Sequence, residues 1–140
     1  MPMTVRDVMT KEVTTLKRNE SLTLADDLMH LGRIRHLPVL DDDGETLIGI
    51  ITQRDLFRGA LAQAIGYGQF ARRKLLNSLV VKEVMTTDPT TTTPETPLTD
   101  AARVLMQNKI GCLPVVEKGR LVGILTEGDF VALYARTDGN

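Results

Sequence analysis

The sequence predicts a mixed α/β protein in which one β-α-β-β-α arrangement occurs twice. Three observations lead to this prediction: a repeated set of motifs, an amphipathic helical stripe in each copy, and a pair of short apolar stretches that follows each stripe. One such arrangement of about 60 residues buries too little apolar surface to be stable alone. We therefore expect two copies that are related by a pseudo-twofold axis and packed sheet to sheet.

The repeat is visible in motifs that recur in the same order. "VRDVMT" begins at Val5 and returns as "VKEVMT" at Val81, and "LPVL" begins at Leu37 and returns after the same interval as "LPVV" at Leu113. The later motifs "GIIT" and "GILT" are two residues closer together, and the difference lies where "DDDGET" becomes "EKGR". Both of these stretches favour turns, and a length change confined to a turn supports the alignment of the copies.

Each copy continues with an extended stretch and a helix. The extended stretches are expected at Val13–Leu16 and Thr90–Thr93. Apolar residues then recur at helical spacing on one face. These residues are Leu22, Ala25, Leu28 and Met29 in copy one, and Leu98, Ala101, Val104 and Leu105 in copy two. Thr96 followed by Pro97 predicts the N-cap and the first helical residue of the second of these helices.

A β-hairpin and a second helix complete each copy. Apolar stretches on either side of a polar turn predict the two strands of the hairpin. The strands are expected at Leu37–Leu40 with Leu47–Ile51, and at Leu113–Val116 with Leu121–Leu125. Gly44 and Gly119 can supply the positive φ that these turns need. The second helix is expected to begin after Thr52 in copy one and after Thr126 in copy two.

The repeat predicts the domain organisation. We expect repeat 1 at residues 1–65, a linker at 66–80 and repeat 2 at 81–140. The stretch from Ala60 to Leu79 has no counterpart in copy two and looks helical at both ends, with a break at Gly66 and Gly68. The "GYG" of this break follows no predicted strand and lacks the Lys-Ser/Thr of a phosphate-binding P-loop.

Composition argues against several classes of protein. The net charge is −1 with no long block of one sign, which disfavours nucleic-acid binding. No apolar run approaches the ~20 residues of a membrane span, and the first ten residues lack the apolar segment of a secretory signal. Cys112 is the one cysteine and has no partner for an internal disulfide. We therefore expect a cytoplasmic protein without a membrane span.

A Thr-x-x-Asp pattern marks the end of each hairpin. Thr52 and Asp55 form it in copy one, and Thr126 and Asp129 form it in copy two. One interpretation is a helix-capping box, in which the threonine is the N-cap and the acid lies three residues later. The other is a ligand site, because a carboxylate in a first helical turn can accept both hydrogen bonds of a vicinal diol such as a ribose. The sequence leaves both interpretations open.

Basic residues lie near this pattern in copy one. Arg54 precedes Asp55, and with the helix N-terminus it could hold a phosphate. Arg35 and His36 lie just before the first strand of the hairpin. The alternative roles are a solvated charge for Arg35 and for Arg54, and a structural histidine for His36.

The ordered motifs resemble those of the cystathionine β-synthase (CBS) domain, and a tandem pair of such domains is similar to a Bateman module. The resemblance covers nearly the whole chain except the linker. It implies that the final aspartate binds ribose hydroxyls with help from the threonine, that flanking basic residues contact phosphates, and that the base lies against the LPV strand. The residues that it singles out are Arg35, His36, Pro38, Thr52, Arg54 and Asp55 in copy one, and Pro114, Thr126 and Asp129 in copy two.

The copies differ at the candidate phosphate contacts. Arg35, His36 and Arg54 correspond to Gly111, Cys112 and Gly128 in copy two. A charge-assisted hydrogen bond contributes roughly 1.5–3 kcal/mol, so its loss weakens binding by roughly ten- to a hundredfold. We expect the Asp55 site to bind an adenine nucleotide. The Asp129 site is expected to bind it weakly, or to bind a less charged adenosyl compound.

The predicted function is regulation by ligand binding, without catalysis. No nucleophile with a base partner, metal-ligand spacing or Walker motif appears in the sequence. The resemblance implies a sensing module that binds AMP, ADP, ATP or a similar adenosyl ligand in the cleft between its repeats, requires no cofactor, forms a homodimer and signals to a client protein. The alternative is a structural or interaction module with vestigial clefts, in which Asp55 and Asp129 serve only as caps. A DNA-binding regulator would need a basic face on the folded protein.

Overall fold

The computed structural model describes residues 2–64 and 76–137, and the side chains within these ranges except those of 59–64. The chain divides into two compact units. The first unit is Thr14–Asp88, and the second unit combines Met1–Val13 with Pro89–Asn140. The predicted linker extends from 66 to 80, and its residues 66–75 lie outside the described part of the chain.

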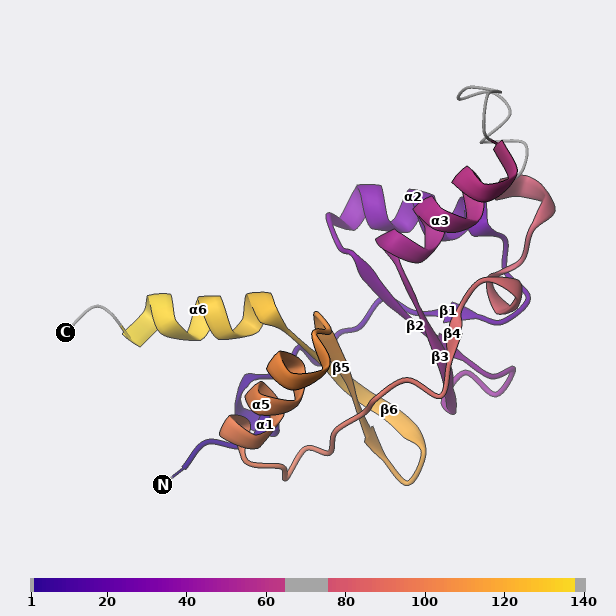
Figure 1. The fold of residues 1–140 in the computed structure, drawn as a ribbon. Helices are drawn as coiled ribbons and strands as arrows, with labels where there is room; N and C mark the ends of the chain where they lie inside the picture. The colour runs from indigo at the N-terminus through magenta and orange to yellow at the C-terminus, as the bar shows by residue number, and fades with distance from the viewer. Residues whose placement is uncertain (1, 65–75, 138–140) are drawn as a thin grey trace. The chain divides into compact units, whose positions relative to one another are not determined.

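The first unit is a four-stranded sheet with helices (Figure 1). Its strand order is β1-β2-β3-β4, with β1 parallel to β2 and the other two pairs antiparallel. Helices α2 and α3 lie side by side on one face of this sheet. The elements are β1 (Leu16–Lys17), α2 (Leu22–Gly32), β2 (His36–Leu40), β3 (Leu47–Thr52), α3 (Gln53–Ala64), the 3₁₀ helix η1 (Val81–Glu83) and β4 (Thr86–Thr87).

The second unit has the same arrangement, but isolated β-bridges replace its edge strands. Its elements are α1 (Val5–Val8), α5 (Leu98–Asn108), β5 (Cys112–Glu117), β6 (Arg120–Thr126) and α6 (Glu127–Thr137). The antiparallel β5–β6 hairpin is bordered by isolated bridges, parallel between Thr92 and Val115 and antiparallel between Thr10 and Ile124. These bridges take the places of β1 and β4, so the predicted mixed α/β class and both hairpins are confirmed.

Each unit buries its own apolar cluster. In both clusters the predicted helical stripe meets the hairpin strands, which explains why α2 and α5 form where they do. The first cluster includes Leu22, Ala25, Met29, Leu37, Val39 and Ile51. The second includes Val5, Leu98, Ala101, Leu105, Leu113 and Leu125.

The VMT segments are exchanged between the sequence copies. Thr86 of the second VMT motif pairs with Ile50 in the first unit, and Thr10 of the first motif pairs with Ile124 in the second unit. Val5 and Val81, at the heads of the two motifs, are fully buried in the same exchanged arrangement. Each compact unit therefore completes its sheet and core with the VMT segment of the other copy.

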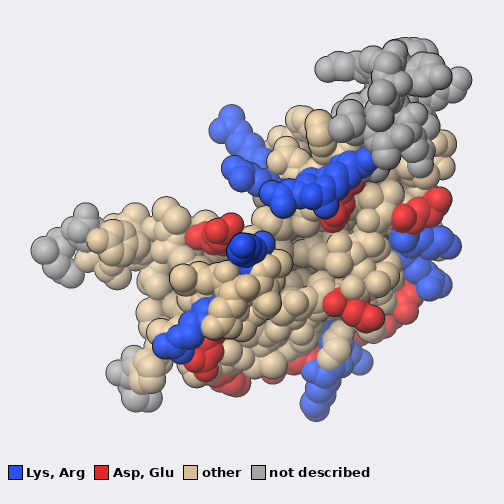
Figure 2. Space-filling model, viewed as in Figure 1, with Lys and Arg blue, Asp and Glu red and all other residues tan. Residues whose placement is uncertain are grey.

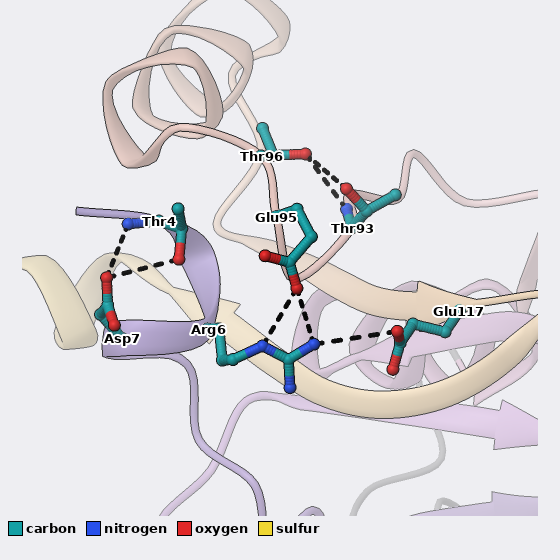
Figure 3. Close-up of polar contacts among 7 residues, drawn as sticks. All are labelled: Thr4, Arg6, Asp7, Thr93, Glu95, Thr96 and Glu117. Atoms are coloured by element: carbon teal, nitrogen blue, oxygen red, sulfur yellow. Dashed lines mark hydrogen bonds and ion pairs between the residues drawn. The ribbon is translucent and has the colours of Figure 1, made fainter. Parts of the chain in front are cut away.

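Polar contacts join the first VMT segment to the rest of the second unit (Figure 3). The backbone N–H of Val5 donates to the carbonyl of Thr96 at 2.9 Å. Arg6 donates from Nε and Nη2 to Oε1 of Glu95 at 3.1 and 2.7 Å, and its Nη2 lies 3.8 Å from a carboxylate oxygen of Glu117. The hydrogen bond and charge of Glu95 raise the pKa of Arg6. Because these charged side chains are exposed, the ion pairs contribute little to holding the segment. The backbone hydrogen bond and the buried side chains of Val5 and Val8 contribute more.

Backbone geometry confirms both predicted hairpin turns and corrects one helix boundary. Gly44 and Gly119 have φ of 74° and 79°, as the hairpin turns require. The prediction for α5 is wrong by one residue, since the helix begins at Leu98 and Pro97 is the N-cap. Thr96 does not cap the helix because its hydroxyl lies 2.8 Å from that of Thr93 and closes the preceding turn (Figure 3).

Candidate functional site

The structure gathers five of the candidate residues at one end of the first hairpin: Arg35, His36, Thr52, Arg54 and Asp55. Thr52 is the last residue of β3 and lies opposite His36, the first residue of β2. The N–H of Gln53, which begins α3, donates to the carbonyl of Arg35 at 2.9 Å. The backbone thus places Arg35 and His36 beside the Thr52-x-x-Asp55 junction.

Asp55 forms the predicted capping box with one of its two carboxylate oxygens. The N–H of Thr52 donates to Oδ2 of Asp55 at 3.0 Å, and the N–H of Asp55 donates to the hydroxyl of Thr52 at 3.1 Å. The aspartate is half-buried, and no described residue donates a hydrogen bond to its Oδ1. The capping interpretation is therefore correct at this position, and it leaves one acceptor oxygen of Asp55 available to a ligand.

The remaining candidates of the first unit differ in exposure. Arg35 and Arg54 are exposed, and His36 is half-buried. Pro38 is buried opposite Ile50, two residues along β2 from His36 and hence on the same face of the strand. Figure 2 shows Lys and Arg side chains over the part of this unit in which α2 and α3 lie. Arg54 lies in the first turn of α3, beside Asp55.

The equivalent aspartate of the second unit is more fully bonded. Oδ2 of Asp129 accepts from the N–H of Thr126 at 2.8 Å and from its hydroxyl at 3.4 Å. Oδ1 of Asp129 accepts from the hydroxyl of Thr10 at 3.1 Å. Sequence reasoning missed Thr10, although its recurrence in both VMT motifs was a signal. Both carboxylate oxygens of Asp129 therefore carry protein hydrogen bonds.

The three positions near Asp129 that correspond to Arg35, His36 and Arg54 carry no cation, and Glu127 adds a negative charge in the same helical turn. Cys112 lies opposite Thr126 and is buried, as is Pro114 two residues further along β5. A side chain added at Gly128 would have as its nearest neighbour the hydroxyl of Thr126, 3.5 Å from the new Cβ. The position that corresponds to Arg54 is thus open and uncharged.

The Cys112 thiol gives a testable pH dependence. Burial raises its pKa to about 12, whereas the pKa of a cysteine in an unfolded chain is about 8.5. Between these values the unfolded chain releases a proton that the native chain keeps, so the free energy of unfolding should fall as pH rises. Comparing urea unfolding of the wild type and Cys112→Ala from pH 7 to 10.5 should show a steeper decline for the wild type. Parallel pH profiles would contradict this assignment.

The described residues contain neither a cluster of metal-binding side chains nor a helix that could span a membrane. Within residues 2–64 and 76–137, no group of three or more His, Cys, Asp or Glu side chains is arranged to hold a metal ion. In the same ranges, every helix is too short or too polar to cross a membrane.

Comparison with known proteins identifies the family. The CBS domain model matches residues 5–62 and again residues 81–136. The chain belongs to the CBS domain family. The CBS domain-containing protein DDB_G0289609 of Dictyostelium discoideum is 32% identical over 137 residues, which cover 97% of this chain and 94% of that protein.

Two solved CBS-pair structures resemble the whole chain. CBSX2, which is an Arabidopsis thaliana protein, has been solved in complex with AMP; that structure has a TM-score of 0.78 and 34% identity, over 96% of this chain and 98% of that one. The CBS domain pair of protein MJ0100 has been solved in complex with 5′-methylthioadenosine and S-adenosyl-L-methionine. It has a TM-score of 0.80 and 29% identity, over 99% of this chain and 100% of that one. The tandem CBS architecture predicted from the motifs is therefore confirmed.

Many CBS relatives are longer than this chain. It covers 42% of an archaeal relative of unassigned function and between 21% and 23% of the enzymes that it matches. In these proteins the CBS pair is therefore one part of a larger polypeptide.

Proposed function

We propose that the chain is a regulatory module that binds an adenosyl ligand at the hairpin–helix junctions, with Asp55 at the principal site. The observation that carries this proposal is the half-buried Asp55, whose Oδ2 is used by the capping box and whose Oδ1 accepts nothing from the described residues. Complexes of other CBS pairs with AMP and with S-adenosyl-L-methionine support an adenosyl compound as the ligand.

Each candidate residue has a chemical role in this proposal. Oδ1 of Asp55 accepts a ribose hydroxyl, and the Thr52 hydroxyl, which accepts the N–H of Asp55, keeps its own proton to donate. Arg35 and Arg54 are exposed cations that can pair with a phosphate near the N-terminus of α3. In the second unit, Thr126 and Asp129 are expected to hold the sugar. We assign Pro38 and Pro114 to the surface that contacts the base, and His36 at the strand end to the phosphate contacts.

The two sites are expected to differ in affinity. Isothermal titration calorimetry with AMP, ADP and ATP should give one tight and one weak site per chain, because Arg54 corresponds to Gly128. S-adenosyl-L-methionine and 5′-methylthioadenosine, which carry no phosphate, should discriminate less between the sites. Two equal sites for AMP would contradict the assigned difference. No binding of any of these compounds would favour the structural module with vestigial sites.

A gain-of-function variant tests the role of charge. Gly128→Arg should strengthen AMP binding at the Asp129 site by about tenfold, since one charge-assisted hydrogen bond to phosphate is restored. The geometry permits the substitution because the new Cβ meets its nearest neighbour at 3.5 Å. Gly128→Gln is the matched control and should leave the affinity near that of the wild type. Calorimetry at two salt concentrations should show that the gain shrinks as salt rises.

For the module to be regulatory, ligand binding must change its interaction with a partner protein. A ligand shifts a conformational equilibrium only through different affinity for two states, so the client protein should prefer either the loaded or the empty module. We also propose that the module is cytoplasmic and forms a homodimer. Val131 and Tyr134 on α6, which are 69% and 72% exposed, support such an association. Sedimentation velocity with and without AMP tests it, and a monomer under both conditions would exclude the dimer.

A further inference from the structure

The hydroxyl of Thr10 bonds to Asp129 where the proposed function places a ligand hydroxyl. We propose that Thr10 is an affinity-determining residue of the second site, because it competes with the sugar of an adenosyl ligand for Oδ1 of Asp129. The hydrogen bond is 3.1 Å long and joins residues 119 positions apart in the sequence. This inference rests on the proposed function, since it concerns the same class of ligand.

The first unit provides an internal comparison. Thr86 is the counterpart of Thr10 in the second VMT motif, and it pairs with Ile50 as Thr10 pairs with Ile124. Within the described residues, the Thr86 hydroxyl makes no hydrogen bond and Oδ1 of Asp55 accepts none. Equivalent backbone positions therefore carry a hydroxyl that bonds to the aspartate in one unit and does not do so in the other.

Counting acceptor positions shows why this difference affects binding. An ionised carboxylate offers about four lone-pair sites. Asp55 uses one, for the N–H of Thr52, whereas Asp129 receives three hydrogen bonds, two from Thr126 and one from Thr10. A vicinal diol brings two donors. Asp55 can accept both without losing a protein bond, but Asp129 can do so only after a bond such as that of Thr10 is given up.

The competing hydroxyl can leave without disturbing the sheet. The backbone of Thr10 is held by two hydrogen bonds to Ile124, each of 2.9 Å, and its side chain is exposed. Rotation of one side-chain torsion would release Oδ1 of Asp129 while the VMT segment stays in place. The expected effect of Thr10 on affinity is accordingly moderate, about three- to tenfold.

Three variants test the inference in the full chain by calorimetry with AMP and 5′-methylthioadenosine. Thr10→Val keeps the β-branched shape but removes the hydroxyl, and it should strengthen binding at the Asp129 site by about three- to tenfold. Thr10→Ser keeps a hydroxyl and should bind like the wild type. Thr86→Val is the matched control, and it should leave both sites unchanged because its hydroxyl has no bond to lose. Urea unfolding of each variant checks that the fold is retained.

The outcomes separate this inference from the proposed function. If the wild type binds AMP at the Asp55 site and Thr10→Val leaves the second site unchanged, Thr10 does not compete and only the inference is overturned. Weaker binding in Thr10→Val would also overturn it, since the hydroxyl would then contact the ligand directly. If the wild type and all variants bind none of the probes, the proposed function fails and the inference fails with it.

Discussion

The Asp55→Asn variant is expected to lose about ten- to a hundredfold in affinity for AMP, while its free energy of unfolding changes by less than about 0.5 kcal/mol. In the wild type, the N–H of Thr52 donates to Oδ2 of Asp55 at 3.0 Å. The amide oxygen of asparagine can accept the same hydrogen bond, so the capping box survives. The charge of the oxygen proposed to bind the sugar is lost. Calorimetry with AMP and urea unfolding measure the two quantities separately.

Two further variants separate the effect of the lost charge from loss of the helix cap and from effects at the other site. Asp55→Ala removes the cap as well as the charge, and it should lower stability by about 1 kcal/mol in addition to abolishing tight binding. Asp129→Asn should leave the tight site unchanged, because that site is assigned to the other unit. If Asp55→Asn binds AMP as tightly as the wild type, Asp55 is only a helix cap and the structural-module alternative gains support.

The Gly49→Ala variant is expected to lower the free energy of unfolding by about 1–3 kcal/mol. A Cβ at this position would lie 2.6 Å from the sulfur of Met85 and 2.8 Å from the carbonyl oxygen of Thr86. The methionine can move, but the carbonyl belongs to the β4 strand that pairs with β3. Relief of the clash therefore requires β4 to separate from β3, which urea unfolding followed by circular dichroism should register.

The same argument applies to the second unit. A Cβ at Gly123 would lie 2.7 Å from the sulfur of Met9 and 3.0 Å from the carbonyl oxygen of Thr10, so Gly123→Ala should also be destabilising. Gly128→Ala is the matched control, because its Cβ meets nothing closer than 3.5 Å. Replacing this helical glycine should leave stability unchanged or raise it by up to about 1 kcal/mol. Equal destabilisation by all three substitutions would contradict the close-approach explanation.

These contacts explain why the same motif recurs as "GIIT" and "GILT". The glycine allows the VMT segment of the other copy to approach the strand. The branched residues fill the core, with Ile51 and Leu125 fully buried. The threonine ends the strand, and the aspartate three residues later bonds to its N–H in both units. The motif therefore combines a packing requirement, a helix boundary and a candidate ligand contact.

Local patterns predicted both hairpins and the four longer helices, but they did not predict α1, η1 or β4, which the VMT segments form. Apolar stretches on either side of turn residues located both hairpins, and helical spacing located α2 and α5, because these signals depend on neighbours within a few residues. The Thr-x-x-Asp spacing predicted the junctions with Asp55 and Asp129. The N-cap of α5 was misplaced by one residue because Thr93, outside the helix, bonds to Thr96.

The sequence by itself determined that the protein is a tandem repeat, that each copy carries a hairpin ending in Thr-x-x-Asp, and that only one copy has cations there. The tertiary structure alone decided that the VMT segments are exchanged and that Thr10 bonds to Asp129. The reason is that both features join residues distant in the sequence, and the two VMT motifs are so similar that either could match either hairpin locally. Which VMT motif pairs with which hairpin depends on the connections and packing of the whole chain, and a short sequence pattern does not predict these.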